Sequence, residues 1–119
     1  PIIMVCNGTG IAPFRQFWQL AASGAIPRRR MVLFFGCRAP YEELHVQEVR
    51  QLQSRRLLEY YVAYSRSGYQ PCRIQEKMVE HGSRVWELIK SGGLVYVCGG
   101  TRMEAGVRDA LRDIVERHG

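Results

Sequence analysis

A glycine turn between an apolar run and a helix start is the stretch of this sequence best suited to chemistry. The apolar residues 2–6 are followed by Asn7, and then by Gly8 and Gly10 on either side of Thr9. Glycines let a backbone come close to a ligand, and free N–H groups at a helix N-terminus point at it. The order strand, glycine turn, helix therefore predicts a phosphate site, although such a turn can also be only a tight connection. It is neither Gly-x-Gly-x-x-Gly nor a Walker loop, because residue 13 is proline and no Gly-Lys-Ser/Thr follows.

Three other apolar runs are also followed by a glycine or a cation. They lead into Gly36-Cys37-Arg38, Ser65-Arg66 and Cys98-Gly99-Gly100. Continuous apolar runs of this length are typical of strands that are buried on both faces of a parallel sheet. Ligands of such sheets bind at the carboxyl ends of the strands, near the switch in strand order. The four segments together predict a site for a negatively charged dinucleotide.

The segments between these apolar runs show the periodicity of amphipathic helices. Apolar residues three and four positions apart predict helices at about residues 12–22, 41–54, 74–80, 84–90 and 103–117, the fourth capped by Ser83. Strands that alternate with helices indicate a parallel sheet with right-handed crossovers. We therefore predict an α/β fold, a three-layer sandwich with helices on both faces of a Rossmann-like parallel sheet.

Composition limits the classes of protein to which this chain can belong. A length of 119 residues, with 46% hydrophobic and 24% charged residues, is typical of one globular domain. The net charge of +6 favours an anionic ligand or partner. No apolar run approaches the roughly 20 residues of a membrane-spanning helix. The four cysteines and three histidines lack ligand spacing, so we expect no metal site, and reduced, buried thiols in a reducing, cytoplasmic compartment.

Two basic clusters precede strands instead of following them. They are Arg28-Arg29-Arg30 and Arg55-Arg56, and the second comes shortly before a group of tyrosines within residues 60–64. Arginines near aromatic residues can bind nucleic acid, which is an alternative function. The preferred interpretation is a solvated loop and a helix end, without a nucleic-acid partner. Both clusters should lie at the end of the sheet opposite to the dinucleotide.

Several strings of residues, taken in order, resemble one known family. They are Gly8-Thr9-Gly10-Ile11-Ala12-Pro13-Phe14-Arg15, Phe34-Phe35-Gly36-Cys37-Arg38, Tyr64-Ser65-Arg66, Val85-Trp86-Glu87-Leu88-Ile89 and Tyr96-Val97-Cys98-Gly99. Together they resemble the nicotinamide-binding half of the ferredoxin–NADP reductase superfamily. The likeness is greatest to its diflavin branch: NADPH–cytochrome reductases, nitric oxide synthase reductase domains and sulfite reductase flavoproteins. It covers essentially the whole chain.

The resemblance implies that residues 1–119 are the NADP-binding domain of a longer flavoprotein oxidoreductase. In that family the domain binds NADPH and presents its nicotinamide to an FAD held by a preceding domain. Electrons then pass to FMN and on to a haem or other redox acceptor protein. We expect FAD- and FMN-binding domains upstream, because these residues carry no flavin site. A non-catalytic nucleotide-binding module of the same fold is the alternative, and anchoring of the parent to the endoplasmic reticulum membrane stays open.

The resemblance also implies roles for single residues. Ser65 and Arg66 match the pair that recognises the adenosine 2′-phosphate, and a hydroxyl beside a guanidinium suits a phosphate dianion. Thr9 either contacts the ligand or only closes the turn, and Arg38 either lies beside the cofactor phosphates or is a surface residue. Cys98 either lies against the nicotinamide as the catalytic residue or only packs. The other implied cofactor-binding residues are Gly8, Gly10, Arg73, Gln75, Gly99 and Met103.

The sequence departs from the family pattern at several positions. The family usually has Lys-x-Tyr-x-Gln where this chain has Pro71, Arg73 and Gln75. In an extended segment these three residues share a face. Arg73 therefore either supplies the positive charge of the missing lysine or is a solvated residue at a helix start. Gly100 and Gly106 stand where the family usually has Asp.

Overall fold

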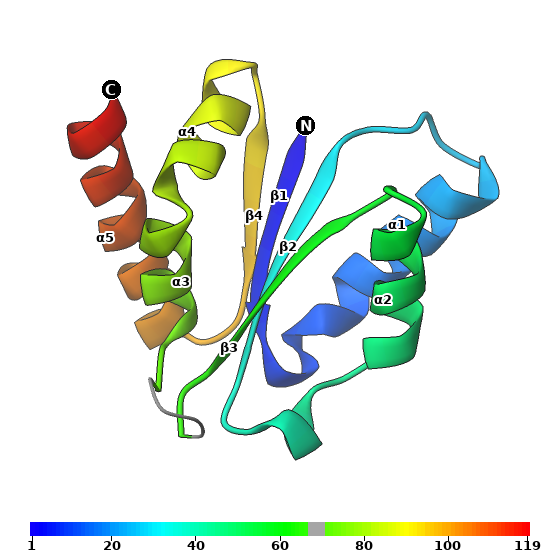
Figure 1. Ribbon diagram of the computed structural model, residues 1–119, viewed down its shortest axis with the longest axis horizontal. Coiled ribbons are helices and arrows are strands. Elements are labelled where there is room, and N and C mark those ends of the chain that lie inside the picture. Colours follow the sequence, from blue (N-terminus) through cyan, green and yellow to red (C-terminus); the bar gives the residue numbers. More distant parts are fainter. Residues whose placement is uncertain (67–70) are drawn as a thin grey trace.

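Four parallel strands form one sheet in the computed structural model, which describes residues 1–66 and 71–119. Their order across the sheet is β3-β2-β1-β4. The strands are β1 (Ile2–Asn7), β2 (Met31–Cys37), β3 (Glu59–Tyr64) and β4 (Leu94–Cys98). Because β1 and β2 are central, nearly all of their residues are buried. The predicted α/β sandwich with a parallel sheet is confirmed (Figure 1).

Helices cover both faces of this sheet, two on one side and three on the other (Figure 1). Neighbouring residues of a strand point to opposite faces, so one apolar run supplies both cores. Met4 and Phe35 belong to the core of the first face, whereas Val5 and Phe34 belong to that of the second. The helices of the first face are α1 (Ala12–Ser23) and α2 (Val46–Ser54), and those of the second are α3 (Ile74–Glu80), α4 (Gly82–Lys90) and α5 (Thr101–His118).

The helix predicted over residues 41–54 begins later than expected. A short 3-10 turn, η2 (Pro40–Glu42), comes first, and α2 starts only after His45, whose φ is +56°. Between them, the carboxylate of Glu43 accepts hydrogen bonds from two tyrosine hydroxyls of β3. This attachment to a distant strand holds the chain away from a helical path.

Two smaller predictions are wrong. Ser83 lies inside α4, which begins at Gly82 and has no side-chain cap. Of the four free cysteines only Cys6 is buried, and the other three are half-buried. Cys37 and Cys98 are the last residues of their strands, where the helical layers no longer cover the sheet fully.

The strand β4 forms one edge of the sheet and is its least covered strand. It pairs with β1, and among the described residues no strand lies beyond it. Its side chains Leu94 and Tyr96 are 54% and 49% exposed. The helix that follows β4, α5, packs on the second face of the sheet, together with α3 and α4, and does not cover the first face (Figure 1). Within the described part of the chain, no helix is long and apolar enough to cross a bilayer.

Candidate nucleotide-binding site

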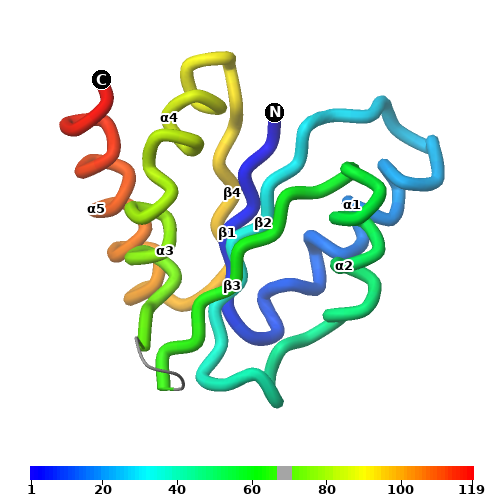
Figure 2. The backbone as a smooth tube through the Cα atoms, viewed as in Figure 1, coloured from blue at the N-terminus to red at the C-terminus, as the bar shows by residue number. Residues whose placement is uncertain are grey.

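The carboxyl ends of the strands surround a cavity of about 530 Å³. Figure 2 shows the segments that follow β1, β2 and β4 at this end of the sheet, with both chain termini at the opposite end. The first turns of α3 and α5 complete the wall. Seven residues singled out from the sequence line this cavity: Gly8, Thr9, Arg38, Ser65, Arg73, Gln75 and Met103.

The glycine turn after β1 packs against the end of β4. It forms a 3-10 turn, η1 (Gly8–Ile11), in which Gly8 has φ +51°, a conformation that side chains disfavour. A Cβ on Gly10 would lie 2.5 Å from the carbonyl oxygen of Cys98. The chain therefore needs a glycine at both positions, one for the backbone angle and one for the close approach. The contact joins β1 to β4, where the strand order switches.

Four of the predicted site residues lie outside the cavity wall. Gly10 and Cys98 are next to it, at the contact between the glycine turn and β4. The thiol of Cys98 is half-buried and packs beside the core of the first face. Gly99 follows it and is exposed. Arg66 is exposed beyond the end of β3, and its charge helps to lower the pKa of Glu42.

An ion pair between Arg38 and Glu42 occupies one side of the cavity. The guanidinium contacts both carboxylate oxygens, with Nη2 2.6 Å from Oε1 and Nε 3.1 Å from Oε2. Hydrogen bonding from Arg38 lowers the pKa of the Glu42 carboxyl, and the charges of Arg38 and Arg66 add to this effect. Glu42 is therefore an anion at neutral pH. Its negative charge lies where phosphates are expected.

The loop that carries this ion pair is fixed to β3. Glu43 accepts a hydrogen bond of 2.6 Å from the Tyr60 hydroxyl and another from the Tyr64 hydroxyl. Burial, followed by the hydrogen bond to Glu43, raises the pKa of Tyr64 to about 12. Burial and the charges of Glu43 and Glu42 raise the pKa of the Cys37 thiol to about 11. Cys37 is therefore protonated at neutral pH and unsuited to act as a nucleophile.

Arg73 both caps a helix and lines the cavity. It is the N-terminal cap of α3, where its backbone N–H donates to Glu76 Oε1 at 3.1 Å, and it is one of the residues of the cavity wall. Among the described residues its guanidinium has no ion pair. Gln75 lies in α3, not in an extended segment, yet it lines the same cavity.

Two charged residues among the described lining residues were not singled out from the sequence: Glu42 and Arg102. Glu42 follows Arg38 by four residues, a spacing at which opposite charges commonly pair. Arg102 lies in the first turn of the helix after β4, and its position in the fold was the only available signal. Counted over the described residues, the cavity wall thus combines three guanidiniums and two hydroxyls with one carboxylate. Guanidiniums and hydroxyls are the donors that phosphates prefer, so the residues present fit a phosphorylated dinucleotide.

The described residues hold no group of three or more His, Cys, Asp or Glu side chains that could bind a metal ion. The arrangement of the site is one for binding and orienting a ligand through hydrogen bonds and charge. No strongly activated nucleophile lines it among the described residues, because the pKa values of its two lining thiols, Cys37 and Cys72, are both raised, first by burial.

The chain is similar in sequence to several known oxidoreductases. The chain is 41% identical over its whole length to an NADPH–cytochrome P450 reductase of Dictyostelium discoideum, of which it covers 18%. It is 37% identical, again over its whole length, to the sulfite reductase [NADPH] flavoprotein alpha-component of Aliivibrio fischeri, of which it covers 20%. It is also 34% identical to a self-sufficient cytochrome P450 monooxygenase of Aspergillus terreus. That alignment includes 97% of this chain and 12% of the monooxygenase.

These relatives belong to the diflavin branch that the sequence strings resemble, so that resemblance is confirmed. The chain spans about a fifth or less of the length of these relatives. Residues 4–109 match the family described as oxidoreductase NAD-binding domain. The match includes β2, β3 and β4, most of β1, and every described residue that lines the cavity. The chain therefore belongs to the family of oxidoreductase NAD-binding domains.

Proposed function

We propose that residues 1–119 are an NADP-binding domain that holds NADPH at the carboxyl ends of its strands and presents the nicotinamide to an FAD held by another domain. When bound, NADPH supplies a hydride, and electrons pass from FAD to FMN and then to a haem or other redox acceptor. The names of the relatives support NADPH as donor, a flavin as carrier and a cytochrome P450 as one acceptor. The observation that carries the proposal is the cavity where Arg38, Arg73 and Arg102 converge with two hydroxyls.

Each part of the cofactor is assigned to its own residues in this proposal. Ser65 and Arg66 recognise the adenosine 2′-phosphate, with Arg73 supplying the charge of the family's lysine. The backbone of the turn at Gly8, Thr9 and Gly10 binds the pyrophosphate, because its glycines allow close approach. The remaining cations neutralise the phosphates. Charge-assisted hydrogen bonds of this kind fix orientation as well as affinity.

The nicotinamide end lies beside Cys98 in the proposal. The close packing of Gly10 on the Cys98 carbonyl places the phosphate-binding turn next to this residue. A cofactor whose pyrophosphate lies on the turn can therefore reach the end of β4 with its nicotinamide. Cys98 then acts on hydride transfer by contacting the ring, while Gly99 and Met103 shape the surface on which it rests.

Calorimetry of this chain with NADP⁺ and NAD⁺ tests the proposal directly. We expect NADP⁺ to bind about ten- to a hundredfold more tightly, the effect of one hydrogen bond to a charged group. Arg66→Ala should remove most of this preference and leave NAD⁺ binding nearly unchanged. Arg112→Ala on the exposed side of α5 removes the same charge far from the strand ends and serves as the control. Equal affinities of the unaltered chain for the two nucleotides would contradict the proposal.

A further inference from the structure

A second cavity, of about 670 Å³, lies at the amino-terminal end of the sheet, opposite to the nucleotide site. Two loops form it, one between α1 and β2 and one between α2 and β3, which lie together at this end (Figure 1). The first loop contributes Arg28, Arg29 and Arg30, and the second contributes Arg56. The floor is made of apolar and aromatic residues such as Met31. The fold thus brings two basic clusters, distant in sequence, to one hollow.

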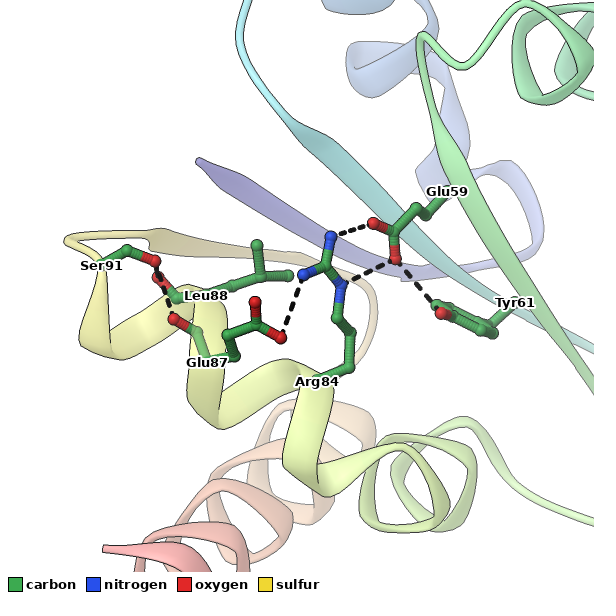
Figure 3. Close-up of polar contacts among 6 residues, drawn as sticks. All are labelled: Glu59, Tyr61, Arg84, Glu87, Leu88 and Ser91. Atoms are coloured by element: carbon green, nitrogen blue, oxygen red, sulfur yellow. Dashed lines mark hydrogen bonds and ion pairs between the residues drawn. The ribbon is translucent and has the colours of Figure 1, made fainter.

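The described part of the protein gives none of these four arginines a directly paired carboxylate. The one carboxylate among the described lining residues is Glu59. Its oxygens accept hydrogen bonds from the Arg84 guanidinium and from the Tyr61 hydroxyl at 3.2 Å (Figure 3).

Glu59 is therefore already paired. The hydrogen bond from Arg84 makes the largest contribution to the lowered pKa of Glu59, and the charge of Arg30 makes a small one. Arg84 also contacts Glu87, with 3.2 Å between its Nη1 and the Glu87 Oε2 (Figure 3). The cavity consequently presents four guanidiniums whose charge no described carboxylate offsets fully.

The backbone at Arg56 gives independent support for a role of its side chain. Arg56 follows α2 with φ +60°, in the left-handed conformation where helices usually end in glycine. Its N–H donates to the Gln53 carbonyl at 3.0 Å, and that of Leu57 donates to the Leu52 carbonyl at 2.9 Å, as in a Schellman motif. A glycine would meet these bonds without strain. Strained residues of this kind cluster at binding sites.

We propose that this second cavity binds a soluble ligand that carries several linked phosphate groups. Planar guanidiniums bind phosphate oxygens in pairs, and four of them match an anion with several such groups. A hollow with an apolar floor favours a compact ligand over the extended backbone of a nucleic acid. Because the two cavities lie at opposite ends of the sheet, the ligand and the nucleotide can be bound together. The proposal does not depend on the function proposed for the first cavity.

Inorganic tripolyphosphate is the probe for this site, measured by calorimetry at low salt on the whole chain. The test variant, Arg29→Gln with Arg56→Gln, removes one charge from each loop. The control, Arg108→Gln with Arg112→Gln, removes two charges from α5. A third variant, Arg38→Gln with Arg73→Gln, removes two charges from the nucleotide cavity and measures how much tripolyphosphate binds there. We expect the test variant to lose at least about tenfold in affinity at the second cavity, the loss of one charged hydrogen bond or more, and the α5 control to change affinity less than about twofold.

Arg56→Gly is a second test, and it does not require the fold to accept a glutamine at residue 56. It removes the side chain and relieves the backbone strain, so we expect weaker tripolyphosphate binding together with an unchanged or higher melting temperature. An equal loss in all variants would reduce the effect to net charge and overturn the proposal. So would a loss confined to Arg38→Gln with Arg73→Gln, an absence of binding by the unaltered chain, or tighter binding of a single-stranded oligonucleotide at equal phosphate concentration.

Discussion

Glu42→Gln should strengthen the binding of NADP⁺, because Glu42 and the 2′-phosphate compete for the same cations. Its carboxylate pairs with Arg38 through both oxygens and is close enough to Arg66 for that charge to lower its pKa. A 2′-phosphate that reaches Arg66 must approach this anion. Glutamine keeps the shape of the side chain and removes the repulsion.

The size of the expected change in NADP⁺ affinity depends on how far solvent screens the charges of Arg38 and Glu42. Arg38 is exposed and Glu42 is partly exposed, with 59% and 27% of their side chains accessible, and surface charge pairs of this kind change equilibrium constants by about 1.5- to fivefold. A phosphate dianion carries up to twice the charge of a carboxylate, which doubles the interaction free energy and therefore squares the fold-change, so we expect NADP⁺ affinity to rise about two- to 25-fold at low salt. In 1 M salt the screening length is about 3 Å, and the gain should nearly vanish.

The assay is calorimetric titration of NADP⁺ and NAD⁺ at low and high salt. NAD⁺ has no 2′-phosphate, so its affinity should hardly change, and the ratio of the two should rise. Asp113→Asn is the matched control, since Asp113 also pairs with an arginine four residues away, Arg117, but on the last turns of α5. The reasoning is refuted if NADP⁺ affinity is unchanged at low salt, or if NAD⁺ binding weakens, because Glu42 would then serve the ribose hydroxyls instead.

Three further predictions concern the nucleotide site. Arg73→Ala should weaken NADP⁺ binding less than Arg66→Ala and lose its effect in high salt, as titrations at two salt concentrations can establish; equal affinity at low salt would make Arg73 a surface residue. Cys98→Ser, in a protein that includes the flavin domains, should slow flavin reduction by NADPH at least about tenfold in stopped flow, with NADP⁺ affinity and melting temperature unchanged; an unchanged rate would leave Cys98 as a packing residue. Gly10→Ala should lower the urea-unfolding free energy by about 1–3 kcal/mol, because its Cβ meets the Cys98 carbonyl, whereas Gly100→Ala, with open space around it, should change little.

The sequence was sufficient to predict the sheet and the end at which the site lies. Apolar runs and helical periodicity are local patterns, and the alternation of the two leaves few topologies open. Parallel strands carry their following segments to the same end of a sheet, so residues as far apart as Thr9 and Ser65 could be placed together before the structure was known. Both do line the same cavity.

What could not be predicted depends on contacts between distant residues. The start of α2 is delayed by Glu43, whose partners are tyrosines on the next strand. Glu42 was missed because its segment was predicted to be helix, and because its importance comes from Arg66, which is distant in sequence. The basic clusters around Arg29 and Arg56 were correctly placed at the far end of the sheet, but periodicity carries no information on how two loops converge.

The exposed edge formed by β4 affects how all of these titrations should be carried out. A strand with one partner leaves backbone donors and acceptors along its outer side, and such a row can pair with the same row of another copy. Leu94 and Tyr96 add apolar surface to that side. Pairing of two copies through β4 would increase with the square of the protein concentration. Light scattering at the concentrations used for calorimetry would therefore show whether part of the measured heat comes from self-association and not from ligand binding. The substitution Tyr96→Lys would place a charge on this edge strand and should prevent two copies from pairing there.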